Sequence, residues 1–179
     1  MIPVAFDYCR PGTLAEAHAA LTAAGDAVIL SGGQSLMTDL KLRRKRPRLV
    51  VDLQAIAALS AVEIGSDAVR IGAMVRQADL VADEAVVSRL PLLAQIANVA
   101  ADPMVRRRGT LVGALCAVEQ GGDWLAGCLA MDAVVEIAGA RGTREVPLTA
   151  FVRGPRTTAL DAHEIAVAVR LRTAPNKAR

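Results

Sequence analysis

The stretch Ile29-Leu30-Ser31-Gly32-Gly33-Gln34-Ser35-Leu36 decides the fold, because it joins a short apolar strand to a helix through two glycines. Glycines let the backbone turn tightly and approach a ligand closely. Consecutive amide groups where a helix begins can hold a phosphate. The stretch has neither the GxxxxGK spacing of a Walker loop nor the GxGxxG spacing of a dinucleotide fingerprint. By itself it indicates a tight turn, which either only connects two elements or also binds phosphate.

The elements on both sides of this stretch predict a small α/β lobe over residues 1–56. Thr13, followed three residues later by Glu16, is typical of a helix N-terminus, and Gly25 of a helix end. The elements predicted here are an opening strand, a helix over 13–25, a strand over 27–30, a helix over 36–42 and a strand over 48–52.

Residues 57–173 predict a second, larger lobe in which helices accompany an antiparallel sheet. The turns Gly65-Ser66-Asp67 and Gly139-Ala140-Arg141-Gly142 each lie between two apolar runs, as in hairpins. The predicted strands are 61–64, 68–71, 133–138, 144–147 and 164–172, and the predicted helices are 76–82, 91–101 and 126–132. The fold class is therefore α+β, and residues 174–179 are predicted to be a frayed tail.

The composition excludes several classes of protein. Hydrophobic residues make up 53% of the 179 residues, which excludes a disordered chain. Aromatic residues make up only 2%, which argues against nucleic-acid binding by base stacking. The N-terminus lacks the pattern of a signal peptide, and no apolar run reaches the length of about 18 residues that a membrane span needs. The three cysteines lack the spacing of a zinc site or a disulfide framework, so we expect a cytoplasmic protein with no membrane or nucleic-acid partner.

The net charge of +3 arises largely from two short clusters, Lys41–Arg48 and Arg106–Arg108. Such clusters bind nucleic acid, an acidic partner or a phosphorylated ligand, or they only keep the surface hydrated. The second cluster leads into Gly109-Thr110-Leu111-Val112-Gly113, where a hydroxyl and free amides could grip a diphosphate. An ordinary loop with surface arginines is the alternative. No nucleophile signature and no metal-ligand spacing occurs in the sequence, so no catalytic residue is assigned.

Short motifs then follow one another along nearly the whole chain. They are Phe6-Asp7-Tyr8-Cys9-Arg10-Pro11-Gly12-Thr13-Leu14-Ala15-Glu16-Ala17, Ser31–Leu36, Lys41-Leu42-Arg43, Val50-Val51-Asp52, Ile71-Gly72-Ala73, Pro103–Thr110, and Thr157-Thr158-Ala159-Leu160 with Glu164. In this order and spacing they resemble the flavin subunit of the molybdenum hydroxylases. That family includes the medium subunit of carbon monoxide dehydrogenase and the FAD domain of xanthine dehydrogenase.

The resemblance implies a two-lobed FAD-binding fold of the PCMH type, with FAD between the lobes. The chain would be an FAD-dependent oxidoreductase component that transfers electrons, in complex with molybdenum-cofactor and iron–sulfur subunits or as a homodimer. By position, Asp123 would lie near the adenosine end, and Ala100 and Ala166 would contact the flavin. The other cofactor-binding residues it implies are Ile29, Leu30, Ser31, Gly32, Gly33, Gln34, Ser35 and Leu36 in the first loop, and Thr110, Leu111, Val112, Gly113 and Ala114 in the second.

Two departures from the family pattern support an alternative. In the second loop, Val112 replaces a glycine, and a β-branched side chain there is expected to resist a positive φ and to obstruct a phosphate. The following segment Cys116-Ala117-Val118-Glu119-Gln120 also replaces the family's usual sequence. The second departure is length, from which we expect a truncated form that lacks the C-terminal domain of the family. The alternative is a repurposed, stand-alone enzyme or ligand-binding protein, for example in secondary metabolism, with altered or no flavin binding. Glu119, Asp123 and Trp124 would form its polar site, unless they are only a hydrated loop and a core tryptophan. A third interpretation is a non-catalytic interaction module.

Overall fold

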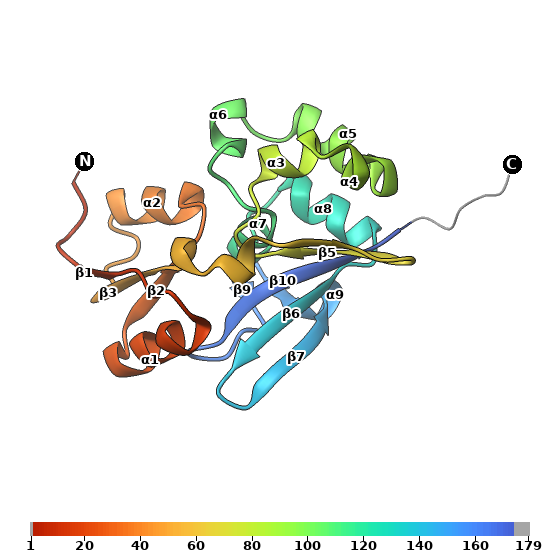
Figure 1. Cartoon of the computed structure of the whole chain (residues 1–179). Helices are drawn as coiled ribbons and strands as arrows, with labels where there is room; N and C mark the ends of the chain where they lie inside the picture. Colours follow the sequence, from red (N-terminus) through yellow and green to blue (C-terminus); the bar gives the residue numbers. More distant parts are fainter. Residues whose placement is uncertain (1, 174–179) are drawn as a thin grey trace, which may run out of the picture.

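Three parallel strands form the sheet of the first lobe in the computed structural model, which describes residues 2–173 (Figure 1). The order is β1-β3-β2, and the strands are β1 (Asp7–Cys9), β2 (Ala27–Leu30) and β3 (Leu49–Asp52). Helix α1 (Leu14–Ala24) connects β1 to β2, and helix α2 (Gln34–Lys41) connects β2 to β3. Thr13 caps α1 by accepting a hydrogen bond from the Glu16 amide, and Gly25 ends it with a φ of 69°, as the sequence predicts. The tail predicted over 174–179 lies outside the described residues.

The second lobe contains a five-stranded antiparallel sheet in the order β4-β5-β10-β6-β7. Both predicted hairpins are confirmed, since β4 pairs with β5 and β6 pairs with β7. The strands are β4 (Val62–Ile64), β5 (Ala68–Gly72), β6 (Val134–Gly139), β7 (Gly142–Pro147) and β10 (Ile165–Arg172), with a separate small hairpin of β8 (Val152–Gly154) and β9 (Thr157–Thr158). The helical segments are η1 (Leu53–Ala55), η2 (Ala57–Ser60), α3 (Gln77–Ala82), α4 (Glu84–Arg89), α5 (Pro91–Val99), α6 (Pro103–Arg106), α7 (Leu111–Ala117), α8 (Asp123–Ala130) and α9 (Leu148–Phe151).

The two lobes share apolar packing. Ala17 and Leu21 of α1 belong to the same buried cluster as Ala138 of β6 and Ile165 of β10. A larger cluster lies between the five-stranded sheet and its helices, and it includes the fully buried Phe151. Because the cluster that contains Ala17 and Ile165 includes residues of both lobes, apolar packing sets how the two lobes face each other.

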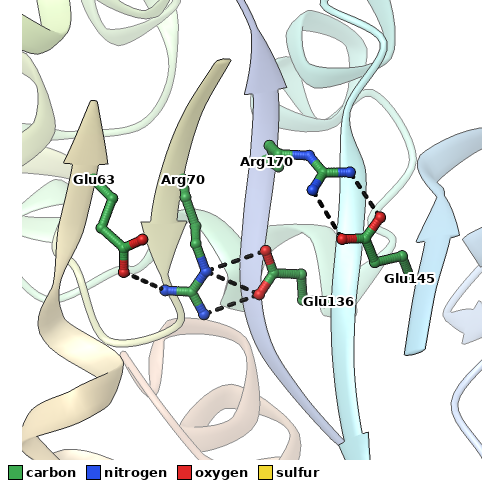
Figure 2. Close-up of polar contacts among 5 residues, drawn as sticks. All are labelled: Glu63, Arg70, Glu136, Glu145 and Arg170. Atoms are coloured by element: carbon green, nitrogen blue, oxygen red, sulfur yellow. Dashed lines mark hydrogen bonds and ion pairs between the residues drawn. The ribbon is translucent and has the colours of Figure 1, made fainter. Parts of the chain in front are cut away.

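Five charged side chains form ion pairs across the strands of the five-stranded sheet, as Figure 2 shows. Arg70 contacts Glu63 at 3.1 Å on one side and Glu136 at 2.9 Å on the other. Arg170 contacts Glu145 at 2.7 Å and 2.8 Å through both terminal nitrogens. The alternate residues of these strands, among them Val69, Ile71, Val135, Ile137 and Val169, are buried in the core. One face of the sheet therefore packs in the core and the other carries these charged pairs, while β10 is buried on both faces from Ile165 to Val169.

Candidate functional site

A cavity of about 710 Å³ lies between the two lobes and is lined by both glycine-containing loops. Its volume falls in the range of about 300–1,000 Å³ that is typical of small-molecule sites. A smaller pocket of about 350 Å³ lies beside α3 and η2 and is lined by neither loop. The larger cavity is therefore the candidate functional site.

The first loop presents the start of α2 to this cavity. Gly33 is the residue before the helix, and its φ of 75° is a left-handed conformation that suits glycine. No side chain among the described residues caps α2 at this end. Because the first amide groups of a helix have no partner within the helix, those of α2 remain available to an anion. Gln34, Ser35 and Leu36 of this first turn line the cavity.

The second loop is the capped start of a helix. The Thr110 hydroxyl accepts a hydrogen bond from the Gly113 amide at 3.1 Å, which caps α7. The same hydroxyl lies 2.8 Å from the Ser31 hydroxyl of the first loop. Gln77 donates to the Thr110 carbonyl from its Nε2 at 3.2 Å. Thr110 is buried, so it joins the two loops in the interior, where a lost hydrogen bond is costly.

Gly32 brings the two loops into direct contact. A Cβ built on Gly32 would lie 2.7 Å from the Gly109 Cα and 3.0 Å from the Thr110 amide nitrogen. Both distances are shorter than an ordinary van der Waals contact, and the neighbouring atoms belong to backbone that cannot rotate away. Glycine is therefore required here because of a close approach between loops that are far apart in the sequence.

The structure corrects the prediction for Val112. The residue lies in the first turn of α7, and it is not among the residues with a positive φ. Its side chain is 2% exposed and packs in the core while also lining the cavity. The expectation of a conflict between a β-branched residue and the backbone is wrong, because the segment after Thr110 is helical rather than a left-handed loop.

The cavity brings together nearly all of the predicted cofactor-binding residues. Those that line it are Ile29, Ser31, Gly32, Gly33, Gln34, Ser35, Leu36, Ala100, Thr110, Val112, Gly113, Ala114, Asp123 and Ala166. Leu30 and Leu111 do not line it, and Leu111 is fully buried in the core. Glu119 and Trp124, named for the alternative polar site, also lie on the wall. Trp124 is 5% exposed and belongs to the larger core cluster, as a core tryptophan would.

Sequence reasoning missed other residues of the wall. Asp39, Gln77, Arg156 and His163 all line the cavity. The sequence does single out Asp39. It is the only acidic residue of the helix predicted over 36–42, and a run of cations follows it. Gln77, Arg156 and His163 carry no local signal, because contacts with segments distant in the sequence place them there.

The basic clusters divide between the cavity and the surface. All cations of the first cluster are exposed, and Lys45 among them also lines the cavity. In the second cluster, Arg106 donates to the carbonyls of Ala100 at 3.0 Å and Ala101 at 2.7 Å, which fixes the connection between α5 and α6. Arg106 therefore positions a part of the wall, namely Ala100 and Ala101.

A charged pair fixes the wall on the side of β10. Arg144 contacts Glu164 at 2.6 Å and the Ala159 carbonyl at 2.8 Å, and Glu164 accepts from the Asp161 amide at 2.8 Å. The Arg144 hydrogen bond holds the pKa of Glu164 at about 2, well below its usual value. Glu164 is therefore ionised throughout the neutral range and keeps the segment from Ala159 to Glu164 in place.

Thiol and metal chemistry have little support at this site. Burial raises the pKa of the Cys116 thiol, which lines the cavity, to about 12, so the thiol stays protonated. Within residues 2–173, no group of His, Cys, Asp and Glu side chains is arranged to hold a metal ion. In the same part of the chain, no helix has the length and apolar character needed to cross a membrane.

Comparisons with known proteins agree with this geometry. The family described as the FAD binding domain in molybdopterin dehydrogenase matches residues 4–173. The carbon monoxide dehydrogenase medium chain of Hydrogenophaga pseudoflava is 38% identical over 172 residues, which cover 96% of this chain and 60% of the relative. The nicotine 6-hydroxylase medium subunit of Paenarthrobacter nicotinovorans is 35% identical over 96% of this chain and 61% of its own length.

Solved structures give the same result for the fold. Carbon monoxide dehydrogenase from Hydrogenophaga pseudoflava superposes with a TM-score of 0.95 at 37% identity, covering 98% of this chain and 62% of that chain. Quinoline 2-oxidoreductase from Pseudomonas putida 86 superposes with a TM-score of 0.94 at 32% identity, covering 97% of this chain and 61% of that chain. The two-lobed α+β fold expected from the resemblance is confirmed, and the chain spans about 60% of the length of these curated relatives.

Proposed function

Because the chain belongs to the family of FAD-binding domains of molybdopterin dehydrogenases, we propose that it binds FAD between its lobes and serves as the flavoprotein component of an oxidoreductase. The observation that carries the proposal is the contact between the two glycine loops at Gly32, on the wall of a cavity of about 710 Å³. Two helix starts thereby face the same cavity, and a dinucleotide has two linked phosphates to place there.

The residues of the wall fit this group. The uncapped amides at the start of α2 and the cation Lys45 offset phosphate charge. Ala100, Ala114 and Ala166 are small side chains that leave room for flat rings. When bound, FAD would supply the redox chemistry, while the protein supplies position and electrostatics. The contacts of the individual residues with FAD remain part of the proposal.

We extend the proposal to partners and location. The relatives are named as the medium chain of a dehydrogenase and the medium subunit of a hydroxylase, so this chain would work beside subunits that carry the molybdenum cofactor and the iron–sulfur clusters. The free cysteines of the described residues form no metal-binding group, so any cluster would belong to a partner. These subunits, or a second copy of the chain, would cover the cavity. A cytoplasmic location is part of the same proposal.

A titration of the purified chain with FAD tests the function. We expect flavin absorbance bands and uptake of about one FAD per chain. A Gly32→Ala variant should bind FAD at least about tenfold more weakly, because its methyl group forces the two loops apart. Gly12→Ala is the matched control, since a Cβ there would meet only the Glu16 Oε2, at 3.7 Å.

A folded chain that stays colourless and takes up no added FAD would contradict the proposal. That result would favour the stand-alone enzyme or ligand-binding protein without flavin. The comparisons give no support for that alternative, and one of the observations expected to favour it, a backbone conflict at Val112, is not found in the structure.

A further inference from the structure

One ion pair crosses from lobe to lobe at the wall of the cavity. It joins Asp39 of α2 to Arg156, which lies in the turn between β8 and β9, 117 positions further along the chain. Both residues line the cavity. Within residues 2–173, every other ion pair joins residues of the same lobe. The pair is therefore the electrostatic connection between the two walls.

The burial of Asp39 makes this pair more than a surface contact. The Asp39 side chain is 5% exposed, whereas that of Arg156 is 47% exposed. A buried carboxylate needs a close cation, because desolvation would otherwise be costly. The remaining cation near Asp39 is Arg44, at 3.9 Å with a side chain that is 60% exposed. Arg156 is thus the partner that keeps Asp39 in place.

The Arg156 end is fixed to the second loop. Arg156 has a φ of 56°, and its amide donates to the Val118 carbonyl at 3.1 Å at the end of α7. Helix α7 begins at Thr110, the residue that contacts Ser31 of the first loop. The loops therefore meet at the start of α7, and beyond its end the Arg156–Asp39 pair joins the two lobes a second time.

We propose that the pair between Arg156 and Asp39 is a strap that must open for FAD to enter or leave the cavity. The proposal rests on the function proposed above. Arg156 is a positioning residue, because it holds Asp39 and does not contact FAD. Its loss is therefore expected to change the rates at which FAD enters and leaves, and not the way in which FAD is bound. A strap of this kind makes both uptake and release slower, since both directions pass through the opened state.

Stopped-flow measurements of FAD uptake and release test the strap. In Arg156→Gln and in Asp39→Asn, we expect both rate constants to rise about tenfold, while the dissociation constant changes by less than about threefold. The double variant should be no faster than either single variant, because both changes remove the same contact. Arg156→Lys keeps the positive charge and should restore slow exchange in part. Arg44→Gln is the matched control and should exchange FAD at the wild-type rates.

The outcomes separate the strap from other roles. A rise in the release rate with an unchanged uptake rate would show that Arg156 contacts FAD directly, and it would overturn the strap. Unchanged rates in Arg156→Gln would also overturn it. Hydrogen exchange of the FAD-free chain gives a second readout, in which Arg156→Gln should speed exchange in both α2 and residues 154–158. If the wild-type chain binds no FAD, the proposed function fails, and the exchange data alone decide whether the pair holds the lobes together.

Discussion

Val112 lies where the resemblance leads one to expect a glycine, yet the backbone there is an ordinary helical turn. Its side chain packs in the core, so replacing it would remove buried apolar surface. At Gly32, by contrast, no side chain fits, because the backbone of the second loop lies where a Cβ would be. The two loops thus depend on side-chain size for different reasons, one on core packing and the other on close approach.

We predict that Val112→Gly destabilises the chain without improving FAD binding. Loss of a buried valine side chain and the low helix propensity of glycine together should cost about 2–4 kcal/mol in the free energy of unfolding. Urea unfolding measures the stability, and FAD titration measures the affinity. Val112→Ala should show a smaller loss, since alanine favours the helix. A Val112→Gly variant of wild-type stability and tighter FAD binding would mean that the segment is not helical.

Glu164 predicts a pH dependence of stability. Its folded-state pKa of about 2 lies below its usual value of 4.5, because Arg144 and the Asp161 amide stabilise the ionised form. The contribution of the pair is therefore fully present above about pH 4.5 and is lost as the pH falls toward about 2. We expect Glu164→Gln to lower stability at neutral pH and to flatten its decline between these two values. Arg144→Ala should flatten the same curve, and a slope equal to that of the wild type in both variants would rule out the pair as its source.

At the scale of the elements, Thr110 has two roles that can be separated. Its hydroxyl caps α7 and also contacts Ser31, so Thr110→Ala should lose about 1–2 kcal/mol of stability and weaken FAD binding. Thr13 caps α1 away from the cavity, so Thr13→Ala should lose about 1 kcal/mol and leave the affinity for FAD unchanged. Thermal unfolding and FAD titration of both variants measure the difference. Equal loss of FAD affinity in the two variants would contradict a specific role for Thr110.

The sequence predicted the strands of both hairpins and the first helix, because alternating apolar residues and turn glycines are local signals. Helix α7 was not predicted, because Gly113 and the preceding arginines favour a loop. The role of Thr110 as its N-cap depends on the helix and could not be inferred without it. Helix α8 begins at Asp123 rather than at the predicted residue 126.

In the candidate site, too, local features could be predicted and contacts between distant segments could not. Both glycine loops could be found in the sequence, but their contact at Gly32 could not, because Gly32 and Gly109 are distant in the chain. Asp39 and Arg156 were missed for the same reason, since they are 117 residues apart. Local patterns therefore predicted the pieces of the site, and tertiary packing decides how those pieces meet.

For the whole molecule, the apolar cluster shared by the lobes predicts one unfolding transition. Ala17 and Leu21 of the first lobe pack in the same cluster as Ile165 and Val167 of the second, so neither lobe completes its core alone. We expect circular dichroism and tryptophan fluorescence to report the same melting temperature. Trp124 reports only on the second lobe, so two separate transitions would contradict the shared core. The boundary at residues 56 and 57 remains a prediction, and a fragment of residues 1–56 should not fold.

FAD should raise the melting temperature of the whole chain, because a ligand that binds only the folded state stabilises it by mass action. At a free concentration of about 100 times the dissociation constant, the gain is about 2.7 kcal/mol. Calorimetry with increasing FAD measures this shift, and Gly32→Ala should show less of it. A melting temperature that does not move with FAD would contradict binding to the folded chain.

The pairs of charges across the five-stranded sheet have a consequence for folding accuracy. Arg70 reaches carboxylates on the neighbouring strand β4 and on β6, and Arg170 reaches Glu145 beyond the strand next to it (Figure 2). Sliding any of these strands by one residue would turn its charged side chains into the core and its valines and isoleucines into water. Misaligned sheets of this chain are thereby penalised twice, by buried charge and by exposed hydrocarbon, so the side chains of the sheet themselves specify the correct register.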